Sequence, residues 1–177
     1  MIAVTPVPEP LLYQMTAKQG SPWLRFTDDL AQGFSWRCGY AATFELQGQV
    51  DHYLSQKQHP TRACDWSNFR YASGWVNQRK GIKDAQILDP YQVGAGWFEI
   101  QLPSLELVLT SQVPAAERAR AAFTITWLKL DRGARILRER RYHLRQYVSG
   151  AMTLALVRER MPLLADAIVK AGLQPCP

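Results

Sequence analysis

DWSNFRYASGWVNQRKG, residues 65–81, predicts a short strand that runs directly into a short helix. The strand part, NFRYA, is rich in aromatic residues, which favour strands. Ser73 is a residue type that caps helix N-termini and Gly81 is one that ends helices, so the helix is expected between them. The same segment holds Asn68 and Asn77, two amides beside aromatic residues that neither a core nor a charged surface explains.

A second strand is predicted upstream of this segment. TFELQGQVDHYL, residues 43–54, alternates in polarity, and the polar loop SQKQHPTRACDWS, residues 55–67, separates it from NFRYA. The order is therefore strand, strand, helix. Asp51 and His52 are adjacent on the first strand, where their side chains point to opposite faces. They cannot form a simple Asp–His dyad there, although both could serve one cleft at the end of the strand.

Other elements are predicted on both sides of this unit, and the expected fold class is α+β. Residues 1–22 begin as an extended arm with several prolines, and SPWLRFTDDLAQGF, residues 21–34, predicts a helix that Ser21 caps. WFEIQLPSLELVLT, residues 97–110, predicts one or two strands. The segment that follows, residues 114–130, is ambiguous.

A long basic helix is expected near the C-terminus, from about Asp131 through Arg160. Pro162 either breaks it or opens a final helix that ends at Gly172, so a helical region spans about 131–172. On a helical wheel, one arc is apolar and faces the core, and another is basic. The apolar arc holds Ile136, Leu137, Leu144, Tyr147 and Val148, and the basic arc holds Arg135, Arg138, Arg141 and Arg145.

The basic arc has two explanations. A solvated helix face is favoured, and a surface that contacts phosphate is the alternative. Arg140 falls inside the apolar arc. Because a buried arginine needs an anionic or carbonyl partner, Arg140 is expected either to have a structural partner or to reach into a functional cleft.

Composition limits the class of protein. The chain has 177 residues, of which 47% are hydrophobic and 20% charged, and this is typical of one globular domain, expected over residues 1–177. A net charge of +6 is a weak bias toward polyanions such as nucleic acid. The sequence shows neither a signal-peptide pattern nor a run of ~18 apolar residues, so we expect a cytoplasmic protein without a membrane partner. Three scattered cysteines favour free thiols.

Asp51, His52 and the nearby amides suit phosphodiester hydrolysis. That reaction uses a general base for water and a divalent cation that stabilises the charged transition state. Mg²⁺ prefers oxygen ligands and keeps positions open for phosphate and water. Asp51 offers a carboxylate oxygen, and Asn77, on the helix of the strand-strand-helix unit, offers an amide oxygen. Asp51 and Asn77 could therefore share one Mg²⁺ ion.

The motifs resemble the HNH endonuclease superfamily, whose ββα-metal core has Asp-His on the first strand, Asn at the second and His or Asn on the helix. The matching pieces are VDHY at 50–53, WSNFR at 66–70 and NQRKG at 77–81. His59-Pro60 and Asp89-Pro90 extend the resemblance to a bacterial branch associated with defence and restriction. The HNH-like core would span about 36–90, and the basic C-terminal helix is similar to that of the same branch.

The resemblance implies a role for each position. His52 would be the base that activates water, Asn68 would hold His52 or its loop in place, and Asp51 and Asn77 would bind the metal. Basic residues would contact the nucleic acid, namely Arg79, Lys80, Arg138, Arg141 and Arg145. Plainer explanations stay open for single residues, such as a turn amide for Asn68, a helix-surface amide for Asn77 and a favourable helix-dipole charge for Lys80.

Relatives commonly carry two Cys-x-x-Cys pairs that bind a structural zinc. Here the corresponding positions are Cys38, Ala41, Ser73 and Val76. Since tetrahedral zinc needs four ligands, no structural zinc is expected. Apolar packing by Ala41, Trp75 and Val76 would replace it, and Cys38 would be an ordinary buried cysteine.

The expected function is a Mg²⁺- or Mn²⁺-dependent endonuclease that cuts DNA, with RNA as an open alternative, in an anti-phage or restriction system. Relatives often act there beside an ATPase or another sensor protein. One alternative is a catalytically inactive HNH-fold module that binds nucleic acid or protein. Another is a nuclease subunit of a larger complex that is silent alone.

Overall fold

The computed structural model describes residues 1–13 and 21–176, so residues 14–20 of the predicted arm lie outside the described part. The chain forms two compact units. Unit 1 consists of Met1, Ala3–Ala41 and Glu45–Val93, and unit 2 of Ile2, Ala42–Phe44 and Gly94–Pro177. Two compact units can still unfold as one cooperative domain, so the single domain over 1–177 stays a prediction.

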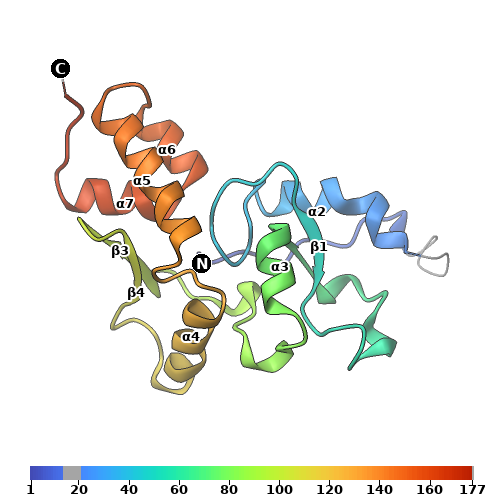
Figure 1. Cartoon of the computed structure of the whole chain (residues 1–177). Coiled ribbons are helices and arrows are strands. Elements are labelled where there is room, and N and C mark those ends of the chain that lie inside the picture. Colours follow the sequence, from blue (N-terminus) through green and yellow to red (C-terminus); the bar gives the residue numbers. More distant parts are fainter. Residues whose placement is uncertain (14–20, 177) are drawn as a thin grey trace. The chain divides into compact units, whose positions relative to one another are not determined.

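Unit 1 contains the predicted order of strand, strand and helix (Figure 1). β1 (Gln49–His52) and β2 (Phe69–Ala72) pair antiparallel, with Asp51 opposite Arg70 and His52 opposite Phe69. α3 (Gly74–Lys80) follows β2 after one residue and contacts β1. The remaining elements of unit 1 are short: η1 (Pro22–Phe26), α2 (Thr27–Gly33), η2 (Pro60–Arg62), η3 (Trp66–Asn68), η4 (Asp84–Gln86) and η5 (Pro90–Gln92).

The first strand is shorter than the alternating pattern over 43–54 predicts. Beyond His52, the backbone N–H and carbonyl of Leu54 bond the side chain of Asn68 instead of a neighbouring strand. The predicted helix over 21–34 is also divided, because η1 precedes α2. Gly33 ends α2 as predicted, but Ser21 makes no side-chain cap bond.

An aromatic core and a buried ion pair stabilise unit 1. The core cluster consists of Tyr13, Leu30, Ala31, Phe34, Trp66, Phe69 and Tyr71. Arg70 is 3% exposed and Asp89 6%, and the guanidinium donates from Nε and Nη2 to the two carboxylate oxygens, each at 2.6 Å. Its Nη1 donates to the carbonyls of Ser67 and Phe69. The ring of Tyr91 covers the guanidinium at 3.7 Å. This pair joins β2 to η5.

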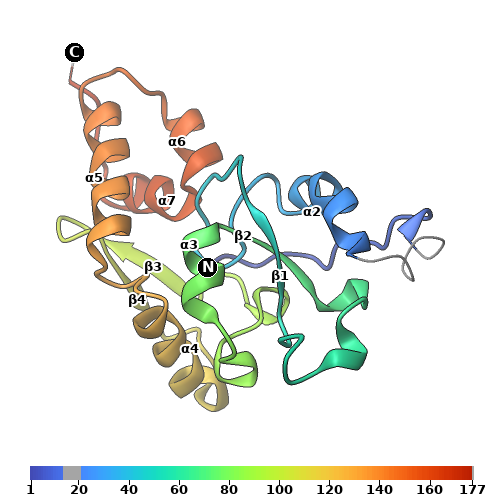
Figure 2. The same cartoon turned by 45° about the vertical axis from the view of Figure 1, so that its right-hand side comes forward.

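Unit 2 consists of a hairpin and a set of helices. β3 (Phe98–Gln101) pairs antiparallel with β4 (Glu106–Leu109), and α7 (Pro162–Lys170) lies against β3 (Figure 2). The ambiguous segment 114–130 forms the helix α4 (Ala115–Trp127). With two two-stranded antiparallel sheets and many helices in the described residues, the fold is α+β, as predicted. None of the helices in those residues has the length and apolarity that crossing a membrane requires.

The single helix predicted from Asp131 to Arg160 is wrong, because two helices occupy this region. α5 (Ala134–Val148) and α6 (Leu154–Arg160) are separated by a turn in which Gly150 has a φ of +75°. Glycine adopts this left-handed conformation without a steric cost, which favours the end of a helix there. The hydroxyl of Thr153 then accepts from the N–H of Leu156 and caps α6. Pro162 opens α7, the second of the two predicted options.

Arg140 has carbonyl partners, as its place in the apolar arc predicts. It is 2% exposed and donates to the carbonyls of Leu105, Leu130 and Asp131 at 2.8, 2.8 and 3.3 Å. Burial lowers the pKa of Arg140 to about 10, so the side chain stays charged at neutral pH. The residue is therefore structural, and it fixes α5 to the β3–β4 hairpin and to the segment before α5.

Candidate functional site

His52 lies half-buried at the end of β1. Its ring contacts the rings of Trp23 and Phe69 edge-on, with centroid distances of 4.8 and 5.0 Å. Because side chains alternate along a strand, the preceding Asp51 points the other way, toward α3. The two side chains therefore do not form a dyad, in agreement with the strand geometry expected from the sequence.

Hydrogen bonds determine which nitrogen of His52 is basic. Nε2 lies 2.9 Å from the backbone carbonyl oxygen of Ala63. A carbonyl can only accept, so Nε2 carries the proton and Nδ1 keeps its lone pair. The amide nitrogen of Gln56 lies 2.9 Å from Nε2 and 3.3 Å from Nδ1. We assign the tautomer from the Ala63 carbonyl, and in it the amide donates to Nδ1 while its closer approach to Nε2 is not a hydrogen bond. Gln56 is exposed, so it can exchange this bond for water.

The surroundings of His52 keep its imidazole neutral. Burial lowers the pKa of His52 below its ordinary value of 6.5, and the charge of Lys80 acts in the same direction. The hydrogen bond to Ala63 and the charge of Asp51 oppose this shift in part. At pH 7, Nδ1 is therefore free to accept a proton, as a general base requires.

The stability of the protein is expected to fall as the pH drops below about 6.5, the pKa of an unfolded histidine. The unfolded chain then binds a proton at His52 that the folded chain binds only at lower pH, so acid favours unfolding across that window. Above pH 6.5, the contribution of the neutral His52 imidazole to the free energy of unfolding is fully present. Denaturant unfolding on both sides of this pH measures the drop. His52→Gln is expected to make the drop smaller, and an unchanged drop would contradict this origin.

Asn68 braces the loop that follows His52. Its Oδ1 accepts from the N–H of Leu54 at 2.7 Å, and its Nδ2 donates to the carbonyls of Leu54 and Arg62 at 2.9 and 3.1 Å. The residue is 1% exposed. The same loop carries Ala63, whose carbonyl orients the imidazole. Asn68 therefore acts on His52 through the loop.

Asp51 belongs to a buried network. It is 2% exposed, its Oδ2 accepts from the hydroxyl of Tyr40 at 2.6 Å, and its Oδ1 accepts from the ammonium of Lys80 at 3.0 Å. Burial, followed by the charge of Asp51, raises the pKa of Tyr40 well above 10, so its hydroxyl stays neutral and donates. Lys80 is 1% exposed and also donates to the backbone carbonyl of His52 at 2.7 Å. It thus joins α3 to the residue that carries the imidazole.

Lys80→Met is expected to lower the free energy of unfolding by about 3–5 kcal/mol, because it leaves the Asp51 carboxylate buried without its counterion. Adding Asp51→Asn should recover part of this loss, since a neutral amide needs no counterion. Denaturant unfolding of both single variants and the double variant gives the coupling energy. Simple additivity of the two losses would show that the pair does not act as a unit.

The side chains of the two predicted metal ligands, Asp51 and Asn77, bond other protein groups in this structure. Both oxygens of Asp51 are engaged, and Asn77 donates from Nδ2 to Oε1 of Gln49 at 3.3 Å. Within residues 1–13 and 21–176, no cluster of three or more His, Cys, Asp and Glu side chains could hold a metal. A divalent ion at Asp51 would have to displace the ammonium of Lys80, and the binding of Mg²⁺ or Mn²⁺ by Asp51 and Asn77 stays a prediction. Asn77 instead borders a hollow of about 510 Å³ together with Gln49, Gly74, Gln78 and Gly81.

The predicted nucleic-acid contacts differ in exposure. Lys80 is buried in its ion pair, so the structure does not present its ammonium to a phosphate, and that interpretation does not fit. The favourable helix-dipole explanation for this residue is incomplete too, because its partner is a carboxylate on β1. Four other predicted contacts are exposed: Arg79 on α3, and Arg138, Arg141 and Arg145 on α5.

The positions that the HNH resemblance compares with zinc cysteines are buried or half-buried. Cys38 and Val76 are 0% exposed and Ala41 is 5%, whereas Trp75 is half-buried. The N–H of Ala41 donates to Sγ of Cys38 at 3.5 Å. Ser73 lies beside the same thiol, but its hydroxyl makes no hydrogen bond of good geometry with a described residue. Burial raises the pKa of Cys38. Cys38 is therefore a buried thiol that stays protonated and is expected to be unreactive.

Three residues at this site are not among those that the sequence predicts. Ala63 acts through its backbone carbonyl, which no side-chain pattern can indicate. Gln56 lies in a polar loop where any residue could be exposed. Tyr40 has a signal that could have indicated its role, because a tyrosine inside the apolar run CGYAA needs a buried acceptor for its hydroxyl. That acceptor is Asp51.

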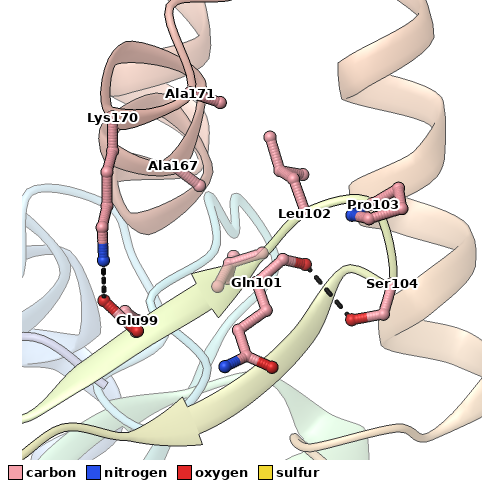
Figure 3. A pocket seen from close by; sticks show the side chains of 9 residues that line it. Glu99, Gln101, Leu102, Pro103, Ser104, Ala167, Lys170 and Ala171 are labelled. Carbon is pink, nitrogen blue, oxygen red and sulfur yellow. Dashed lines mark hydrogen bonds and ion pairs between the residues drawn. The ribbon is translucent and has the colours of Figure 1, made fainter.

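Unit 2 has a hollow of its own beside the β3–β4 hairpin and α7 (Figure 3). Its volume is about 510 Å³. The charged side chains at its edge, Glu99 and Lys170, form an ion pair at 2.7 Å. The hydroxyl of Ser104 donates to the carbonyl of Gln101. These groups bond one another and place no base beside a nucleophile, so His52 is the better candidate for chemistry.

No family model matches the chain, and no curated protein matches it either. The candidate site therefore depends on the geometry around His52.

Proposed function

We propose that the chain is an endonuclease that hydrolyses phosphodiester bonds in DNA, with His52 as the general base. The orientation of the imidazole carries this proposal. Ala63 holds the Nε2 proton, so a neutral Nδ1 with a lowered pKa faces exposed Gln56. The β1-β2-α3 order supports the choice of reaction, because it agrees with the resemblance of this segment to HNH endonucleases.

In the proposed step, Nδ1 of His52 accepts a proton from water while the water oxygen forms a bond to phosphorus. The bond from phosphorus to the leaving oxygen breaks, the leaving oxygen keeps the electron pair and takes a proton from solvent water, and the imidazole becomes an imidazolium. The charge of Asp51 favours that protonated form, since it raises the pKa of His52. Asn68 and Ala63 hold the ring in place during the transfer. A divalent cation, Mg²⁺ or Mn²⁺, stays part of the proposal, and no step is assigned to it.

A nucleic-acid-binding module without turnover is the second candidate. The Asp51–Lys80 pair favours it, because the carboxylate that the resemblance assigns to a cation is already neutralised. A role in an anti-phage or restriction system, beside an ATPase or a sensor protein, belongs to the proposal in either case. In such a complex the chain would cut DNA only when its partner is bound.

Plasmid cleavage distinguishes the two candidates. Purified protein is incubated with supercoiled DNA in EDTA, in Mg²⁺ and in Mn²⁺, and nicked and linear products are followed with time. The nuclease proposal expects cleavage in at least one cation. Cleavage that requires the cation would show that the ion displaces Lys80 or binds elsewhere. DNA binding without cleavage in all three conditions would replace the proposal by the second candidate.

A further inference from the structure

The basic excess of the chain lies in its C-terminal half. Residues 94–177 contain twelve Lys and Arg against seven Asp and Glu, which is +5 of the total +6. Within this half, α5 alone carries five arginines and one acidic residue, Glu139. The charge is therefore concentrated on one helix of unit 2 and is nearly balanced in residues 1–93.

Four arginines of α5 lie exposed on one side of the helix. At 3.6 residues per turn, they fall within an arc of about 120°. Tyr142 is 56% exposed and lies inside the same arc. We call this surface the arginine face, and it consists of Arg135, Arg138, Arg141, Tyr142 and Arg145.

The opposite side of α5 fixes the helix in place. Ile136, Arg140, His143 and Tyr147 are buried there. Arg140 donates to three carbonyls of unit 2, and the hydroxyl of Tyr147 donates to the carbonyl of Leu173 at 3.1 Å. The arginine face is therefore presented on a helix that is held firmly, which lowers the entropic cost of binding a partner.

Three arginines of the arginine face make no ion pair among the described residues, whereas other cations of unit 2 do. Other cations of unit 2 form ion pairs, such as Arg158 with Asp166 and Lys170 with Glu99. In the part of the chain that the structure describes, no ion pair involves Arg138, Arg141 or Arg145. Like charges three or four residues apart on a helix destabilise it slightly. A polyanionic partner would remove that repulsion.

We propose that the arginine face of α5 binds the phosphate backbone of double-stranded DNA. A guanidinium can donate two parallel hydrogen bonds to a phosphate, and a tyrosine hydroxyl can donate one. A helix of about 10–12 Å in diameter matches the roughly 12 Å width of the major groove, so arginines on one face reach phosphates along its edge. Such contacts carry no sequence information. The choice of DNA among polyanions rests on the proposed function.

The test is the binding of a labelled DNA duplex in EDTA, followed by fluorescence anisotropy between about 50 and 200 mM salt. Each phosphate contact contributes about 0.9 to the slope of log K against log salt. The variant R138Q/R141Q/R145Q is expected to make the slope shallower by roughly 2–3 and to weaken binding on the order of 10²-fold at the lower salt. R138K/R141K/R145K keeps the charges and should keep most of the slope.

The control R118Q/R158Q/K170Q removes three exposed charges from α4, α6 and α7. It should leave most of the binding intact, and an equal loss would overturn the assignment to α5. Unchanged binding by R138Q/R141Q/R145Q would also overturn it. If polyglutamate competes as well as DNA at equal charge, the face fits an acidic protein instead. The assay in EDTA follows binding alone and the plasmid assay follows cleavage, so failure of binding and failure of cleavage are separate results.

Discussion

His52→Ala is expected to cut DNA about 10²–10⁴-fold more slowly than the wild type, the range that a general base contributes. The substitution removes Nδ1, the basic nitrogen that the Ala63 carbonyl leaves unprotonated. The ring is only half-buried, so the fold should survive its loss. Initial rates of plasmid nicking under the best cation condition measure the effect.

His59→Ala is the matched control for this prediction. His59 belongs to the same loop, but its imidazole lies 3.5 Å from the Asp84 carboxylate and not beside Nδ1 of His52. It is expected to keep most of the cleavage rate. If both variants lose cleavage to the same extent, the loop and not the imidazole of His52 is responsible. If neither loses it, another group is the base.

A large loss of stability is also expected on breaking the pair of Arg70 and Asp89. Asp89→Ala should lower the free energy of unfolding by about 3–5 kcal/mol, because it leaves a guanidinium buried at 3% exposure without its carboxylate. The loss includes two hydrogen bonds of 2.6 Å between the side chains and the cap on the N–H of Tyr91. Urea unfolding followed by tryptophan fluorescence measures it.

The exposed pair of Arg62 and Asp65 provides the comparison. Its side chains are 43% and 35% exposed, so Arg62→Ala should cost only about 0–1 kcal/mol. If Asp89→Ala and Arg62→Ala lower the free energy of unfolding equally, burial does not explain the contribution of the Arg70–Asp89 pair. A stable Asp89→Ala protein would contradict the joining of β2 to η5 by this contact.

The β1-β2-α3 order could be predicted because its signals are local. NFRYA favours a strand, and Ser73 and Gly81 bracket the helix. The end of β1 could not be predicted, since it depends on the Asn68 side chain bonding Leu54, fourteen residues away in sequence. The break between α5 and α6 was indicated only by Gly150, and one glycine inside a helical pattern does not determine a turn.

The contacts around Asp51 and His52 could be predicted only in part. Alternation along β1 predicts that Asp51 and His52 point to opposite faces, and they do. In the structure Asp51 points toward α3, where Lys80 meets it. Lysine at the end of a helix usually points to solvent, so its burial against Asp51 follows only from the tertiary fold. The orientation of His52 by a backbone carbonyl has no signal in the sequence either. What remains a prediction is the chemistry, including any dependence on Mg²⁺ or Mn²⁺.

Two pKa values decide whether His52 is the base. One comes from the pH dependence of kcat/KM for DNA cleavage, and the other from an NMR titration of the His52 imidazole in the free protein. If His52 takes the proton from water, the two values coincide below 6.5, and the rate rises as the imidazole loses its proton and is level above. A cleavage rate that follows a different pKa, or that falls as His52 deprotonates, would contradict the role of Nδ1.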